Sequence, residues 1–283
     1  RGQVVGLVGE SGSGKSQTAF ASLGVLPNEA VITRGSIRFD GRELVGLTDA
    51  QMRPLRGKEI AYIPQEPMSN LDPSYKVGAQ LVEGVRSALG VTRAEATARV
   101  LALLERVGIA DPKRTFDSYP HQISGGMAQR VLIAGAVASR PKLLIADEPT
   151  TALDVTVQAE ILDLLRDLQS ELDMAILLVT HNFGVVADLC DRIAVMQNGV
   201  IVESGTAAEV FAHRHRGIQR GVRILEDDLD VSRQPASIAR RDPCDGCPVE
   251  ADVASGWRHQ PQHRATDGGL AGSGFPHLSL IHI

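Results

Sequence analysis

The feature that most constrains this chain is an eight-residue run near its start, Gly9-Glu10-Ser11-Gly12-Ser13-Gly14-Lys15-Ser16. It matches G-x-x-x-x-G-K-[ST], in which glycines let the backbone wrap phosphate oxygens, the lysine reaches the β- and γ-phosphates and the hydroxyl binds Mg²⁺. An apolar run, residues 4–8, predicts a buried parallel strand before the loop, and residues 16–26 predict a helix after it. The alternative, an ordinary glycine–serine loop with a solvated lysine, requires neither of these elements.

A second predicted strand, residues 142–146, ends in two acidic residues, Asp147 and Glu148. Ligands of open parallel sheets bind at the carboxyl ends of the strands. We therefore expect Asp147 to hold Mg²⁺, directly or through water, and Glu148 to polarise the attacking water as a general base. Two solvated carboxylates at a strand end are the alternative, which the upstream phosphate loop disfavours.

Three further candidates are Gln65, His181 and the triplet Ser124-Gly125-Gly126. Taken singly, each has a structural interpretation: a polar loop residue, a structural histidine and a helix cap. They gain weight together because all three lie at loop ends that are expected to face one site.

The middle of the chain predicts helices at about residues 77–89 and 93–107 and has no strand pattern as far as Tyr119-Pro120. This stretch interrupts the alternation of strands and helices, so we interpret about residues 66–139 as an inserted helical subdomain. Elsewhere the pattern predicts a strand over 35–41 that ends at an Asp-Gly turn, and a hairpin around Asn198-Gly199.

The composition sets limits on function. The 283 residues are 43% hydrophobic, which is enough for a full core, and the net charge of −5 gives no basic footprint for nucleic acid. No apolar run approaches the roughly 20 residues that span a bilayer. Three cysteines give no disulfide framework, which fits a reducing cytosol.

The order GESGSGKS, Gln65, ISGGMAQ, LLIADE, TALD and His181 resembles the ATP-binding cassette of ABC transporters, over about residues 2–211. The segments IPQEPMSNLDP, YPHQISGGMAQR and ADEPTTALDVTVQAEILDLL resemble the ATPase subunits of bacterial dipeptide, oligopeptide and nickel importers, and ITRGSIRFDG resembles their D-type subunit. The resemblance implies an α/β P-loop NTPase fold (ABC ATPase) over residues 1–212, with a parallel-sheet core and an inserted helical subdomain. It also implies that ATP hydrolysis powers import of peptides or nickel.

The resemblance further assigns a role to each motif. Gln65 would sense the γ-phosphate and Mg²⁺, and His181 would contact the γ-phosphate. The Ser124 motif would cap the ATP of a partner subunit, and Ala152-Leu153-Asp154, the D-loop, would lie at the same dimer seam. The predicted site residues are, for catalysis, Glu148, His181 and Gln65; for ATP, Gly9, Glu10, Ser11, Gly12, Ser13, Gly14, Lys15 and Ser16; for Mg²⁺, Ser16, Gln65 and Asp147; for the partner's ATP, Ser124, Gly125, Gly126 and Gln129; and for the D-loop, Asp154.

The implied partners are a second ABC ATPase subunit, two membrane permease subunits that dock on the helical subdomain and, indirectly, a substrate-binding protein, at the cytoplasmic face of the bacterial inner membrane. One alternative is a non-transport ABC ATPase acting on DNA or the ribosome, which the single cassette and its one compact helical insert disfavour. Another is a module that binds ATP without turnover, which the presence of Glu148 and His181 disfavours. The other subunits choose the transported substrate.

Some positions depart from the family pattern. Asn182 stands where Asp is usual, Ala128 where Arg is common and Pro64 where Phe is usual, and none of them is a phosphate ligand. The family's adenine-stacking aromatic residue would precede Arg1, so we expect a fragment.

The last part of the chain matches the family poorly. We expect residues 213–283 to be a disordered tail or, at its end, a sequencing artefact. Cys244 and Cys247 would supply only half of a metal site, and no second pair accompanies them.

Overall fold

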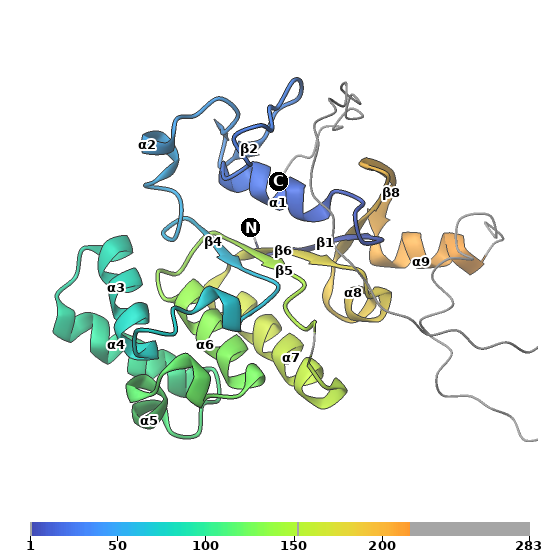
Figure 1. Ribbon diagram of the computed structural model, residues 1–283. Coiled ribbons are helices and arrows are strands. Elements are labelled where there is room, and N and C mark those ends of the chain that lie inside the picture. The colour runs from blue at the N-terminus through green and yellow to red at the C-terminus, as the bar shows by residue number, and fades with distance from the viewer. Residues whose placement is uncertain (1, 152, 216–283) are drawn as a thin grey trace, which may run out of the picture. The chain divides into compact units, whose positions relative to one another are not determined.

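The computed structural model describes residues 2–151 and 153–215, which form a six-stranded sheet flanked by helices (Figure 1). The strand order is β4-β5-β6-β1-β7-β8, and every neighbouring pair is parallel except β7 and β8. The predicted parallel core is therefore confirmed, with an antiparallel strand added at one edge. The strands are β1 (Val4–Gly9), β4 (Ile60–Ile63), β5 (Leu143–Asp147), β6 (Ala175–Thr180), β7 (Arg192–Gln197) and β8 (Val200–Thr206).

Helices cover both faces of this sheet, α1 on one face and α6, α7 and α8 on the other (Figure 1). Along β5, Leu143 and Ile145 pack in the cluster that contains Ala19 of α1, whereas Leu144 and Ala146 pack in the larger cluster on the opposite face. Because both faces are covered, all of β5 is buried and its sequence is continuously apolar up to Asp147. The covering helices are α1 (Lys15–Leu23), α6 (Gly125–Val137), α7 (Val155–Leu172) and α8 (Phe183–Leu189).

The predicted helical stretch contains α3 (Val77–Leu89), α4 (Arg93–Arg106) and α5 (Pro112–Asp117), preceded and followed by single 3₁₀ turns, Met68–Asn70 and Pro120–Gln122. Thr92 begins α4 with a reciprocal capping box, in which its hydroxyl accepts from the Glu95 N–H and the Glu95 carboxylate accepts from the Thr92 N–H. Helix α6 contacts α3 and α4 as well as β4, so it links these helices to the sheet.

Two elements differ from the sequence expectation. Helix α1 ends at Leu23 rather than at residue 26, because Gly24 adopts a left-handed conformation (φ 62°) that turns the chain out of the helix. The strand expected over 35–41 pairs only at β2 (Arg38–Phe39), with β3 (Arg42–Glu43); the predicted Asp-Gly turn between them is confirmed, with both residues at positive φ.

The remaining described elements are α2 (Asp49–Met52) and α9 (Ala207–His215). Helix α9 extends past the predicted boundary at residue 212, and the expectations for residues 216–283, including Cys244 and Cys247, lie outside the described residues. None of the helices in residues 2–151 and 153–215 is long and apolar enough to cross a membrane.

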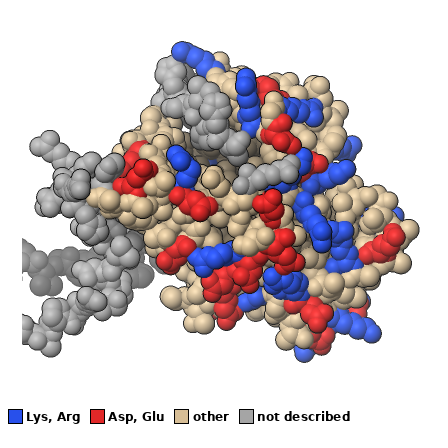
Figure 2. All heavy atoms as spheres, turned by 180° about the vertical axis from the view of Figure 1, so that it is seen from behind, with Lys and Arg blue, Asp and Glu red and all other residues tan. Residues whose placement is uncertain are grey.

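Acidic and basic side chains are interspersed on the face shown in Figure 2. Ion pairs join several of the helices, such as Arg106 of α4 with Glu171 of α7 at 2.8 Å and Arg130 of α6 with Glu160 of α7 at 2.5 Å. The carboxylate partners are about half exposed, so each pair adds at most about 1 kcal/mol, and the apolar core supplies most of the stability.

The stretch from α3 to α5 offers a test of close packing at Gly78 of α3. A Cβ at this position would lie 2.3 Å from the ring of Phe116 in α5, whereas a Cβ at Gly84 of the same helix would meet no atom within 4 Å. Gly78→Ala should lower the free energy of unfolding by about 1–3 kcal/mol through overpacking. Gly84→Ala should raise it by about 0.5–1 kcal/mol through helix propensity. Chemical denaturation measures both, and equal shifts in the two variants would contradict the packing.

Candidate active site

The phosphate loop joins the end of β1 to the start of α1, and its glycines are required by its geometry. A Cβ on Gly9 would lie 2.1 Å from the carbonyl oxygen of Met196 in β7. Gly12 and Gly14 have φ values of 80° and 100°, which other residues adopt only with strain. The loop therefore curls in front of the N-terminus of α1, where unpaired N–H groups and the helix dipole favour an anion.

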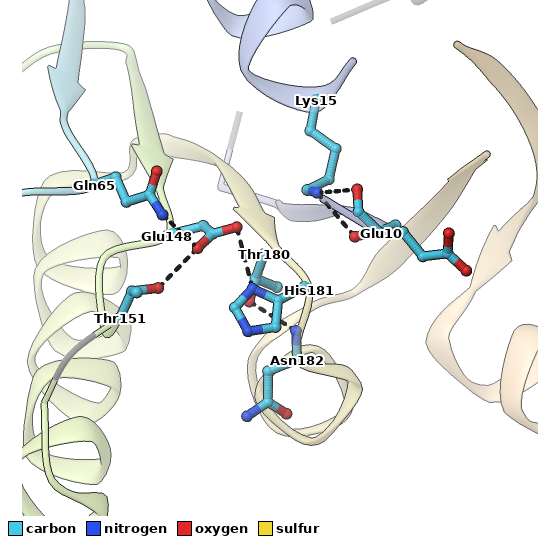
Figure 3. Close-up of polar contacts among 9 residues, drawn as sticks. Glu10, Lys15, Gln65, Glu148, Thr151, Thr180, His181 and Asn182 are labelled. Carbon is cyan, nitrogen blue, oxygen red and sulfur yellow. Dashed lines mark hydrogen bonds and ion pairs between the residues drawn. The ribbon is translucent and has the colours of Figure 1, made fainter. Parts of the chain in front are cut away.

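Lys15 is the first residue of α1, directly after this loop, and is only 5% exposed. Its Nζ donates to the carbonyl oxygens of Gly9, at 2.8 Å, and Glu10, at 2.9 Å (Figure 3). Burial lowers the pKa of Lys15, and the negative charges of Glu148 and Asp147 act in the opposite direction. An ammonium has three donors, so Lys15 keeps one for a ligand beyond these two carbonyl oxygens.

Asp147 ends β5 and is 2% exposed. Burial raises its pKa, and the nearby hydroxyls of Ser16 and Tyr62 act against that rise. Its Oδ1 is buried and has no hydrogen-bond partner among the described residues. A buried carboxylate oxygen that receives no hydrogen bond destabilises the fold unless a cation binds it. Mg²⁺ prefers oxygen ligands of this kind. Asp147 and Ser16 therefore fit the predicted Mg²⁺ site.

Glu148 is the point at which the predicted catalytic residues meet. Its Oε2 accepts from Gln65 Nε2 and from the Thr151 hydroxyl, both at 2.9 Å, and its Oε1 lies 3.1 Å from Nδ1 of His181 (Figure 3). The residue has φ 47°, a left-handed conformation that costs a non-glycine residue about 1–2 kcal/mol. A strained backbone held by several partners is characteristic of functional sites.

His181 is positioned by the turn that follows β6. The Thr180 hydroxyl accepts from the N–H of Asn182, and Oδ1 of Asn182 accepts from the N–H groups of Gly184 and Val185 at the start of α8. Asn and Asp are about equally good N-caps, so the departure from the family pattern at Asn182 keeps this function. The His181 side chain is 47% exposed and therefore accessible to a ligand.

Ser124 is the N-cap of α6, because its hydroxyl accepts from the N–H of Met127. Ser124 and Gly125 are exposed, and a Cβ on Gly125 would meet no atom within 4 Å. Helix α6 packs on the face of the sheet opposite to α1, the helix that begins with Lys15 (Figure 1). The structure therefore does not bring Ser124 and Gly125 together with Lys15, Asp147 and Glu148. Gln129 of the same helix is 1% exposed, and its Nε2 has no partner among the described residues.

Asp154 begins helix α7 as its N-cap, with its carboxylate accepting from the N–H of Val157 at 3.0 Å. The neighbouring Val155 is 82% exposed, an unusual position for a large apolar side chain. The predicted D-loop residue Asp154 therefore lies on the surface, beside an apolar side chain that is largely exposed.

Sequence reasoning missed two residues, Thr151 and Tyr62. A signal for Thr151 was present, because it follows Glu148 by three residues and the two are joined by a turn, Thr151 N–H to Glu148 carbonyl at 3.1 Å. Tyr62 had no such signal: its contact with Asp147 depends on the pairing of β4 with β5, in which Tyr62 lies opposite Ile145.

Comparison with known proteins agrees with this geometry. The model of the ABC transporter family matches residues 1–151. Similar proteins include the oligopeptide transport ATP-binding protein OppD of Bacillus subtilis, 50% identical over 75% of this chain and 59% of its own length. They also include the dipeptide transport ATP-binding protein DppD of Escherichia coli, 45% identical over 84% of this chain and 73% of its own length.

Two solved structures share the fold. One is the dimeric ATP-binding cassette MJ0796 in a post-hydrolysis state bound to ADP and Pi, with a TM-score of 0.64 and 27% identity over 73% of this chain and 86% of that one. The other is cbiO1 of Clostridium perfringens, part of the transporter complex cbiONQ, with a TM-score of 0.62 and 30% identity over 81% of this chain and 86% of that one. The chain belongs to the ABC transporter family and has the α/β P-loop NTPase fold of its ATPases.

Proposed function

We propose that this chain is an ATP-hydrolysing subunit that powers import of peptides through a bacterial ABC transporter. The observation that carries the proposal is the Glu148 carboxylate, which Gln65, Thr151 and His181 hold beside the Asp147 carboxyl and Lys15. The relatives OppD and DppD are named for oligopeptide and dipeptide transport, which favours peptides over nickel as the cargo.

The chemistry that we assign to the site is phosphoryl transfer to water. The loop N–H groups and Lys15 would bind the phosphates of ATP, and Asp147 and Ser16 would hold Mg²⁺, which when bound would supply positive charge to the phosphate oxygens. Glu148 would accept the proton of the water that attacks the γ-phosphorus as ADP leaves, and the donors to its carboxylate fix its orientation.

Gln65 and His181 complete the site from two other segments. The Gln65 side chain contacts Glu148 from the end of β4, next to the helical subdomain. His181 contacts the other oxygen of the same carboxylate from the end of β6. In this proposal Gln65 would also help to hold Mg²⁺ and would report the state of the nucleotide to the helical subdomain, while His181 would stabilise charge on the γ-phosphate.

We further propose a second ATPase subunit as a partner. Ser124 and Gly125 are exposed at the N-terminus of a 13-residue helix, which is suited to an anion, and this helix packs on the face of the sheet opposite to α1. In the proposed dimer they cap the ATP of the partner together with Gly126. Asp154 lies at the same dimer interface. Gln129 is buried, so its role is to support α6 from inside rather than to contact the partner's nucleotide.

The same proposal extends to the transporter as a whole. Two membrane permease subunits dock on the helical subdomain, and a substrate-binding protein acts through them. The cassette then works at the cytoplasmic face of the inner membrane.

Replacement of Glu148 tests the proposed turnover. Glu148→Gln keeps the size of the side chain but removes the base, so the rate of ATP hydrolysis should fall by about 100-fold or more. ATP affinity should change little, because the loop and Lys15 remain. Phosphate release and nucleotide binding are measured on the same preparation, together with the partner subunits. Near-normal hydrolysis in the variant would remove Glu148 from the role of base.

Replacement of Lys15 should instead weaken binding. Lys15→Ala removes a charge-assisted contact to phosphate, so ATP affinity should fall by about 10- to 100-fold. Lys58→Ala is the matched control, because Lys58 is exposed in the turn before β4. Titration calorimetry compares the two variants, and equal affinities would show that Lys15 does not bind the phosphates.

A mixed dimer tests the shared site. One subunit carries Lys15→Ala and the other carries Ser124→Ala; if the sites form across the seam, both lesions fall on one site and the other stays intact. The control places both substitutions in one subunit beside a wild-type partner, which should damage both sites. ATP occupancy per dimer distinguishes these arrangements. Two damaged sites in the first dimer would contradict the shared arrangement.

A further inference from the structure

Tyr62 contacts the proposed Mg²⁺ site from the neighbouring strand. It lies in β4, opposite Ile145 of β5, and β5 ends two residues later at Asp147. The Tyr62 hydroxyl donates to Oδ2 of Asp147 at 3.2 Å. A residue that no motif includes therefore holds one oxygen of the carboxylate that we assign to the metal.

The ring of Tyr62 also packs against the helix that carries the loop lysine and serine. It meets the ring of Phe20 edge-to-face, with centroids 5.9 Å apart and planes at 65°. Phe20 follows Ser16 by four residues in α1, which places both on the same side of that helix. One side chain thus links the strand of Asp147 to the helix of Ser16.

The direction of the contact between Tyr62 and Asp147 follows from the chemistry of the two groups. An ionised carboxylate oxygen can only accept, so the phenol O–H is the donor and Oδ2 of Asp147 is the acceptor, at 3.2 Å.

The orientation of an aspartate carboxyl group needs such a contact. The terminal torsion of Asp has a broad energy profile, so the side chain alone does not decide which oxygen points where. In this structure Tyr62 holds Oδ2, while Oδ1 is buried and has no partner among the described residues. Fixing one oxygen therefore leaves the other available to a cation.

We propose that Tyr62 is a positioning residue of the Mg²⁺ site: its hydroxyl orients the Asp147 carboxyl so that Oδ1 is available to the metal ion. The inference rests on the proposed function, since it assumes that Asp147 is the metal ligand. Partners of metal-ligating carboxylates fix ligand geometry in this way, and their loss commonly lowers metal affinity by 10- to 100-fold.

The test measures ADP binding to the full chain by titration calorimetry, with EDTA and over a series of Mg²⁺ concentrations. Tyr62→Phe removes only the hydroxyl and keeps the ring against Phe20. We expect the Mg²⁺ concentration for half-maximal enhancement of ADP affinity to rise about tenfold, with ADP affinity in EDTA unchanged. Tyr75→Phe is the matched control, because Tyr75 is 60% exposed and should leave both quantities at the wild-type values.

A double variant separates positioning from packing. Asp147→Asn alone should reduce the Mg²⁺ enhancement, and Tyr62→Phe added to it should cause no further loss, because both act on the same contact. The inference would be overturned if the Mg²⁺ concentration for half-maximal enhancement of ADP affinity in Tyr62→Phe were within twofold of the wild-type value. A loss of ADP affinity in EDTA equal to the loss with Mg²⁺ would also overturn it, because it would show a packing defect. If the wild-type chain does not bind ADP in either condition, the proposed function itself fails.

Discussion

The Glu148 carboxylate joins segments that are far apart in the chain: Gln65 from the end of β4, His181 from the end of β6 and Thr151 from the turn after β5. Each of these donors depends on a strand that must end at the same edge of the sheet. The positions of these side chains therefore depend on the register of the parallel strands. A shift of one residue in any of these strands would turn its last side chain to the other face.

The register is fixed by burial on both faces of the sheet. Along β5 alternate residues enter two different hydrophobic clusters, one beneath α1 and one above α6 and α7. A shift of one residue would exchange Leu143 and Ile145 for Leu144 and Ala146, whose sizes differ, so close packing in the two clusters favours one alignment. The packed strand then keeps Asp147, at its end, buried close to the buried Lys15.

Much of the fold and most of the site could be predicted from sequence. The apolar patterns located the helix at 77–89 with its observed bounds, and they located the helix at 93–107 and the strand at 142–146 to within one residue. A predicted helix end was wrong where a single residue determines the local backbone geometry: Gly24 ends α1 three residues before the expected position. Short pairings, such as β2 with β3, also differed, because two paired residues leave little periodicity to detect.

The sequence by itself determined the phosphate loop, the acidic strand end and the membership of the ABC transporter family. Each of these depends on residues that are neighbours in the chain, and glycines, helix caps and apolar runs determine their local geometry. Only the tertiary structure decided that Gln65 and His181 meet on Glu148, that Gln129 is buried whereas Ser124 is exposed, and that Tyr62 reaches Asp147. The physical reason is that these contacts depend on strand order and side-chain burial. Both follow from how the whole core packs and not from any local pattern.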